Sequence, residues 1–231
     1  MQIIEASIVS VRSAIMRFEP ADAGPAFVLF PMIHVADPKF YQEVSQALEQ
    51  CDLILCEGVK SPTASLITSS YRHFAGSPRL GLVAQREMDI SKVRDRMLHA
   101  DVSGEAFEKK WSQMETWWRF AIPLFAPLYG LYVRHFGTRE FIAKGMTMEL
   151  RLASREIFED DDMIEFEEVV LHWRDRHLLS VLERERTKSE NKDAVIGVLF
   201  GASHMRAVIS HLMRKCGYRQ VSAHWATVFN L

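Results

Sequence analysis

Two histidines and a glutamate stand where they can act together. His34 and His204 each follow a Val-Leu-Phe triplet with three residues between, and Glu57 directly follows an apolar run at 52–56. Neutral imidazoles and carboxylates are common ligands of divalent transition metals, and such a metal acidifies a water bound at an open position. The three residues therefore form a candidate metal site, for which the sequence does not distinguish Mn, Co, Zn and Fe.

The elements that must position these residues are short apolar runs, typical of strands buried on both faces of a parallel sheet. They cover residues 26–30, 52–56, 80–84 and 194–200. The carboxyl ends of parallel strands share one edge, where open α/β sheets bind ligands. We therefore expect His34, Glu57 and His204 to converge at that edge, with amphipathic helices following both histidines.

His204 has two interpretations. At a strand exit and the first turn of a helix it contributes little to the core, so His204→Ala is expected to leave the protein folded. The alternative is a buried, hydrogen-bonded histidine whose removal destabilises the fold.

The remaining patterns predict an α/β fold with a mixed central sheet flanked by helices, in a single domain over 1–231. Residues 2–18 alternate polar and apolar side chains as an edge strand or hairpin does, and 218–229 read as a late strand or pair of strands. The Asp37-Pro38 pair predicts a helix start. Residues 91–190 change to a helical period, which predicts a helical insertion or lid there.

The Trp-rich segment 111–136 lies within this insertion. Residues 111–121 suggest one amphipathic helix and 141–158 another. Residues 121–133 are apolar but contain Pro123 and Pro127, and they are too short for a membrane span of about 20 residues. A buried helix pair with a proline kink is favoured, and a hydrophobic lid or a peripheral membrane contact is the alternative.

The helix predicted from 162 to about 185 carries an unusual arginine. The residues three and four positions from Arg174 are Val170, Leu171, His177 and Leu178, whereas a solvated arginine more often has polar neighbours. Arg174 is therefore expected to face other protein. It either forms a structural ion pair or reaches a site, where a cation can stabilise an oxyanion.

Composition excludes several classes of function. A net charge of −2 gives no basic face for nucleic acid. The three cysteines are an odd number without metal-type spacing, which favours buried free thiols. The N-terminus lacks the layout of a secretory signal, so we expect a cytoplasmic protein without a transmembrane span. The sequence leaves open whether the chain forms a homo-oligomer.

The order of these motifs resembles the TraB/PrgY/Tiki group of the EreA/ChaN-like superfamily. The matching residues are Pro31-Met32-Ile33-His34, Cys56-Glu57-Gly58, Arg174-Asp175 and Gly201-Ala202-Ser203-His204. The resemblance implies an EreA/ChaN-like fold with a helical insertion. It also implies that Asp175 belongs to the site beside Arg174. The family has Gly where this chain has Pro31, which weakens the transfer of the metal role to His34.

These observations predict a metal-dependent, peptidase-like hydrolase that acts on a peptide or a small acyl substrate. His34, Glu57 and His204 hold the metal in this hypothesis, and Glu57, Arg174 and Asp175 carry the catalysis. Two alternatives stand beside it. One is a non-catalytic regulatory protein that binds a peptide or a hydrophobic ligand. The other is a metal-independent esterase with Glu57 or a histidine as general base.

Overall fold

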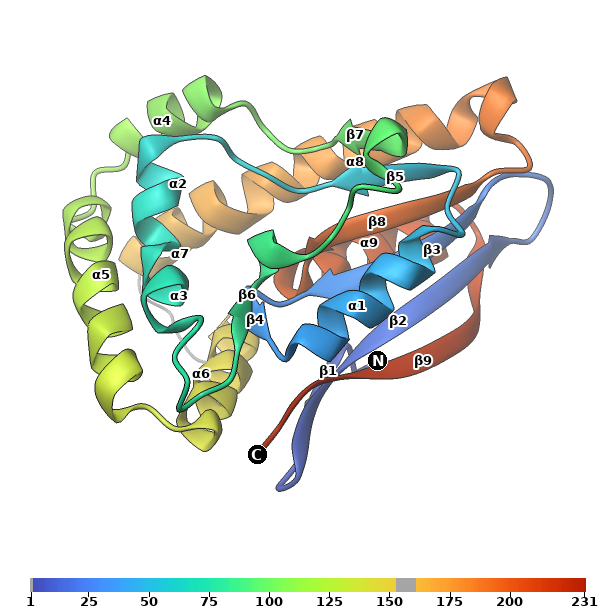
Figure 1. Ribbon diagram of the computed structural model, residues 1–231. Coiled ribbons are helices and arrows are strands. Elements are labelled where there is room, and N and C mark those ends of the chain that lie inside the picture. Colours follow the sequence, from blue (N-terminus) through green and yellow to red (C-terminus); the bar gives the residue numbers. More distant parts are fainter. Residues whose placement is uncertain (1, 153–160) are drawn as a thin grey trace.

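The computed structural model describes residues 2–152 and 161–231 (Figure 1). Within this part of the chain, seven strands form a mixed central sheet. Its order is β1 (Ile4–Ala6), β2 (Ser10–Pro20), β3 (Ala26–Met32), β8 (Val195–Gly201), β5 (Leu53–Cys56) and β7 (Met97–His99), and β9 (Tyr218–Asn230) also pairs with β2. The four strands from β3 to β7 are parallel, whereas β1, β3 and β9 run antiparallel to β2.

The apolar runs form the centre of this sheet as predicted. Phe27, Leu29, Val198 and Phe200 are fully buried, and Leu29 lies beside Val198 in the parallel register. Helix α1 (Pro38–Leu48) covers one face and α9 (Met205–Arg214) the other (Figure 1). The expected α/β class with a mixed, helix-flanked sheet is confirmed, as are the hairpin at the N-terminus and the late strand.

Helix α8 (Trp173–Thr187) also runs over the sheet, next to α9 (Figure 1). The other helices extend beyond the carboxyl ends of the parallel strands. They are α2 (Pro62–Ile67), α3 (Ser69–Phe74), α4 (Gly104–Ser112), α5 (Trp118–Phe136), α6 (Arg139–Leu152) and α7 (Asp161–Glu167). Single 3-10 turns cover Gln85–Glu87, Arg94–Arg96, Ser189–Asn191 and Ala202–His204. A π-helical turn at Glu168–His172 joins α7 to α8, so the predicted helix at 162–185 is confirmed apart from this local widening.

The prediction of a strand at 80–84 is wrong in extent and in place. Only β6 (Val83–Ala84) is extended, and it pairs with β4 (Val35–Ala36) in a separate two-stranded sheet. Gly81 takes a φ of +63°, a left-handed conformation that ends an extended strand. Strand β7 is the strand that pairs with β5 at this end of the sheet. β7 has only three residues and directly follows the 3-10 turn at Arg94–Arg96. A segment this short shows no alternating pattern that would identify it as a strand.

The helical insertion also differs from the expectation. A single helix over 111–121 is wrong, because the chain leaves helix α4 at Ser112 and begins α5 at Trp118. The backbone amides of Glu115 and Thr116 donate instead to the Glu165 carboxylate of α7. The helix predicted at 141–158 corresponds to α6, and residues 153–160 lie outside the described residues.

Residues 121–133 do not form a buried helix pair. They lie in one continuous helix, α5, which contains both prolines and stands at the outer edge of the molecule (Figure 1). Among the described residues, no helix combines the length and the apolar character that a membrane crossing requires.

Candidate active site

A network of charged side chains lies at the carboxyl ends of β5, β7 and β8. Glu57 follows β5, Asp101 follows β7, and His204 lies in the 3-10 turn after β8. Arg174 and Asp175, in the first turn of α8, complete the network from the side. Of the three residues expected to converge, Glu57 and His204 lie together, whereas His34 meets Glu57 only at a cavity wall. Arg174 reaches the same network, and Asp175 and Asp101 join it.

Arg174 is the cation at the centre of this network. Its Nη2 donates to Glu57 Oε1 and to Asp101 Oδ2, both at 2.6 Å, and its Nε donates to Asp101 Oδ1 at 3.0 Å. Its Nη1 donates to the carbonyl of Val170 at 3.0 Å. Burial lowers the pKa of Arg174, but the hydrogen bonds and charges of Asp101 and Glu57 outweigh this effect and raise it. Each guanidinium nitrogen is thus bonded to protein, so Arg174 positions carboxylates.

Asp101 is the member of the network that the sequence did not indicate. Its side chain is fully buried. Besides Arg174, it accepts from the backbone amides of Gly58 at 3.1 Å and Val102 at 2.8 Å. The available signal was its position two residues after a strand, but the sequence analysis did not predict strand β7. Asp101 holds Arg174 and the start of the loop after Glu57 in place.

His204 lies between two carboxylates. Its Nδ1 is 2.7 Å from Asp175 Oδ1, and its Nε2 is 3.6 Å from Glu57 Oε1. Burial lowers the pKa of His204, but the hydrogen bonds of Asp175 and Glu57 and the charge of Glu57 outweigh burial and raise it to about 9. The imidazole is therefore protonated at neutral pH and carries a positive charge between the two acids.

The expectation that His204 contributes little to the fold is wrong. The residue is 2% exposed and bonded to Asp175, which is the alternative of a buried, hydrogen-bonded histidine. The turns that carry the two histidines are not equivalent either. His204 lies in a 3-10 turn that leads directly into α9, whereas His34 precedes the buried strand β4, which delays helix α1.

This environment predicts a pH dependence of stability. Because the pKa of His204 is raised from 6.5 to about 9 on folding, its contribution is complete below pH about 6.5 and is lost as the pH rises through about 9. The free energy of unfolding should fall by on the order of 3 kcal/mol over this range. Urea unfolding at several pH values measures the slope. His204→Gln should remove most of it, and an unchanged slope in that variant would contradict the assignment.

Glu57 connects the network to a cavity. Its Oε2 accepts from the Gly201 amide at 2.6 Å, and its Oε1 lies against Arg174 and His204. Burial raises the pKa of Glu57, but the hydrogen bond and charge of His204 and the charges of Arg174 and His34 outweigh it and hold the pKa well below its ordinary value. A Cβ at position 201 would lie 3.2 Å from Glu57 Oε2, so the glycine permits this approach.

The cavity has a volume of about 360 Å³ and is lined by His34 and Glu57 together. The His34 ring packs on Tyr71 of α3 with 4.5 Å between ring centres, and Arg72 and Arg86 also line the walls. Of the five charged network residues, Glu57 alone lines this cavity. The cavity is in the size range of small-ligand sites.

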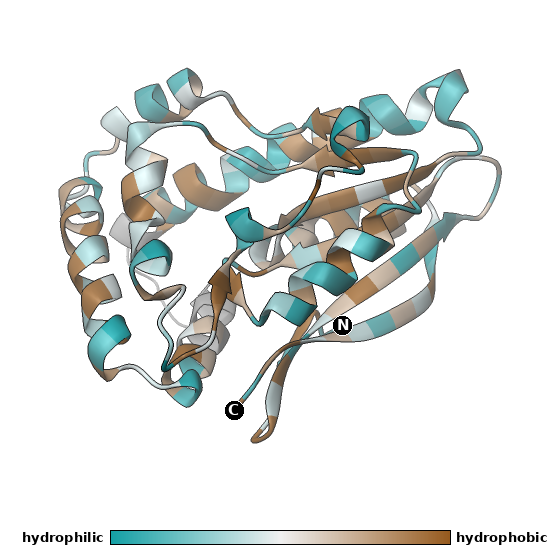
Figure 2. Ribbon diagram, viewed as in Figure 1, coloured by the Kyte–Doolittle hydropathy of each residue, from teal (hydrophilic) through white to brown (hydrophobic). Residues whose placement is uncertain are grey.

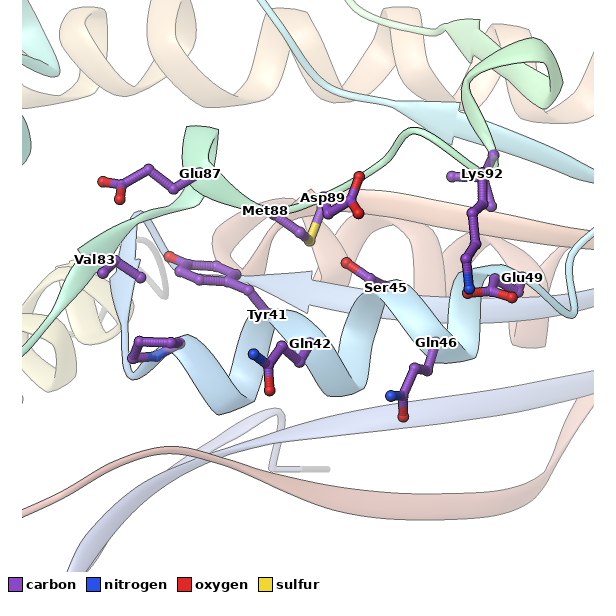
Figure 3. Close-up of a pocket in the computed structure, with 12 residues that line it drawn as sticks. Tyr41, Gln42, Ser45, Gln46, Glu49, Val83, Glu87, Met88, Asp89 and Lys92 are labelled. Carbon is purple, nitrogen blue, oxygen red and sulfur yellow. The ribbon is translucent and has the colours of Figure 1, made fainter.

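A second cavity of about 370 Å³ lies between α1 and residues 83–93 (Figure 3). Tyr41, Ser45 and Gln46 of α1 line one wall, with Glu87 and Asp89 across from them. The Tyr41 hydroxyl donates to the Ile33 carbonyl, and Glu87 accepts from the Ala84 amide, so both serve the local backbone. None of the network residues reaches this cavity, and we therefore place the candidate site at the first one.

Some features of the site favour a bound metal ion and others oppose it. The Asp175 bond to Nδ1 leaves Nε2 of His204 facing Glu57, as is typical of metal-bound histidines. However, Arg174 already donates to the Glu57 oxygen that would be the ligand. Among the described residues, only one group brings three such ligand atoms within 4.8 Å of one another: Glu183 of α8, His211 of α9 and Cys216 just after α9. His34, Glu57 and His204 therefore do not fit a preformed metal site.

Comparison of this chain with models of protein families, with curated proteins and with solved structures finds no match.

Proposed function

We propose that this protein is a hydrolase that works at the cavity lined by His34 and Glu57. The observation that carries the proposal is a buried ion network that ends, through Glu57, in the cavity wall. A carboxyl group whose pKa is strongly shifted, in the wall of a cavity, is typical of catalytic sites. The motif order that resembles the TraB/PrgY/Tiki group supports the same class, and membership of that group is part of the proposal.

In this proposal, Glu57 orients the attacking water. Its pKa is held well below the ordinary range, so it is an ionised hydrogen-bond acceptor and a weak base. His34, on the same cavity wall, is the proton acceptor, because histidine is the side chain that most often serves as a general base. Water then attacks the acyl carbon while His34 takes its proton and returns it to the leaving group.

The other network members are positioning residues. Arg174 and the Gly201 amide hold the two oxygens of Glu57, and Asp175 fixes the orientation of His204. Asp101 in turn anchors Arg174. A rigid supporting shell of this kind keeps a reacting group within the narrow geometry that catalysis needs.

The cavity also indicates the charge of the substrate. Two arginines, Arg72 and Arg86, line it, and Arg86 is exposed. Guanidinium groups recognise carboxylates through paired hydrogen bonds. We therefore propose a small acyl or peptide substrate with an anionic group.

Arg86→Ala should raise KM for an anionic ester by about tenfold, the effect of losing one charged hydrogen bond of about 1.5 kcal/mol. KM for its neutral amide analogue should change little. Kinetics with the matched pair of substrates measure the difference, and Lys39→Ala on α1 serves as the control. Equal changes for both substrates would contradict recognition of the anion by Arg86.

Turnover of fluorogenic ester and peptide libraries, with and without a chelator, tests the function directly. Activity that survives the chelator and fails in His34→Ala supports the proposed metal-free reaction. Activity that the chelator abolishes, with stoichiometric metal in the purified protein, supports the metal-dependent hydrolase, which stays a prediction. Absence of turnover with saturable peptide binding would favour the binding protein.

A further inference from the structure

Helix α5 presents bulky apolar side chains to the outside of the molecule. Phe120, Leu124, Phe125, Leu128, Tyr132 and Phe136 are each more than half exposed. The helix stands at the outer edge, beyond α2 and α3, and Figure 2 shows hydrophobic residues along much of its length. Continuous exposed apolar surface of this kind marks an interaction site.

The packing of α5 fixes which side faces outward. A Cβ at Gly130 would lie 2.5 Å from the carbonyl oxygen of Ser70, so the helix touches α3 at this glycine. Ala121 and Val133 are buried with Gly130 on the inner side. The small residues thus face the protein and the large ones face away, the reverse of an ordinary surface helix.

The charged side chains of α5 are all positive. No Asp or Glu occurs from 117 to 136, whereas Arg119 lies near the start of the helix and Arg134 near its end. The Arg119 guanidinium lies over the Phe120 ring at 4.4 Å, and Arg134 is exposed and donates to the His73 carbonyl. Trp117 and Tyr132 add rings with a polar end, which are typical of the bilayer interface.

We propose that the outward face of α5 binds the surface of an anionic lipid bilayer. Apolar side chains entering the headgroup boundary, with cations at the level of the phosphates, are the chemistry of a peripheral membrane helix. A second copy of the chain fits this face less well. A symmetric contact through α5 would bring Arg119 and Arg134 of both copies to one interface without an acidic residue of this helix to pair with them.

This inference does not depend on the proposed reaction, but it gives the cavity a location. Helix α3 contacts α5 through Ser70 and lines the cavity with Tyr71 and Arg72. A protein bound through α5 would hold the cavity close to the lipid surface.

Vesicle flotation tests the proposal with the full chain. We expect wild type to bind vesicles of phosphatidylcholine with 30% phosphatidylglycerol (about one lipid in three) and to bind less to pure phosphatidylcholine and at high salt. The triple variant Phe120→Ser, Leu124→Ser, Leu128→Ser should lose binding by tenfold or more. The control variant Ile8→Ser, Val9→Ser removes two exposed apolar side chains from the β1–β2 hairpin and should bind like wild type.

Three results would overturn the proposal. The first is that wild type does not float with anionic vesicles. The second is that the triple variant binds these vesicles as well as wild type does. The third is that wild type binds neutral and anionic vesicles equally well. Sedimentation velocity of wild type and the triple variant tests the competing occupant. A wild-type dimer that the triple variant abolishes, without vesicle binding, would assign the face to a second copy. Circular dichroism melts confirm that each variant is folded, which the exposure of the changed residues leads us to expect.

Discussion

Glu57→Gln should reduce turnover at the proposed site by about 10²-fold or more, because the attacking water loses the carboxylate that orients it. Glutamine keeps the size of the side chain but loses the charge that the cavity presents to water and to His34. The measurement is kcat/KM with the best substrate from the ester and peptide libraries. The loss should appear in kcat, because the water is oriented only in the reaction itself.

The matched control for this variant is Glu43→Gln, which removes a carboxylate that pairs with His224 at the surface. It should keep turnover within about twofold of wild type, since surface changes have small effects. Circular dichroism confirms that both variants are folded. Full activity of Glu57→Gln would contradict the proposed site. If Glu57→Gln does not fold, His34→Ala tests the site instead, because His34 lies outside the ion network and its removal should leave the fold intact.

Arg174→Met should destabilise the protein by about 3–5 kcal/mol, since it leaves two carboxylates buried without their cation. The side chains of Arg174, Glu57 and Asp101 are 12%, 17% and 0% exposed. For a chain of this size, the loss corresponds to a fall in Tm of roughly 6–20 °C. Urea unfolding and thermal melts at pH 7 measure both quantities.

Arg176→Met is the matched control, because Arg176 lies two residues away on α8 and pairs with Glu168 at the surface. An exposed pair contributes about 0–1 kcal/mol. Adding Asp101→Asn to Arg174→Met should recover part of the stability, because one buried charge is then removed with its partner. Equal losses in the two arginine variants would show that Arg174 is not the central cation of the network.

The strand-to-turn segments that carry Glu57 and His204 were predictable, because a strand buried on both faces must be built from apolar residues. Residues 53–56 and 194–200 are apolar without alternation, and a segment buried on both faces needs that composition wherever it lies. The neighbours of Arg174 likewise revealed that its helix face meets protein. In each case, the chemical types of residues close in sequence indicate that a segment is buried. They do so whichever other segment covers it.

The identity of the partners could not be read in this way. Asp101 and Arg174 are far apart in sequence, and nothing local states that their strand end and helix turn will meet. Strand β7 is three residues long, too short for periodicity to identify, although pairing with β5 stabilises it in the sheet. Asp175 was indicated through the family resemblance, and its bond to His204 depends on how α8 lies over the sheet.

In helix α5, too, the sequence determined the composition of the segment, and tertiary packing determined which side is exposed. The sequence determined that 118–136 is apolar and free of acidic residues, and apolar segments are usually buried, so a buried helix pair was expected. Tertiary packing decided otherwise, because Gly130 is the position at which α3 and α5 can approach and the bulky residues must then point away. Sequence thus determined the central strands β3, β5 and β8, the candidate residues His34, Glu57, His204 and Arg174, and the apolar character of α5. Only the tertiary structure decided which charges pair and which apolar face stays exposed, since both depend on contacts between distant segments.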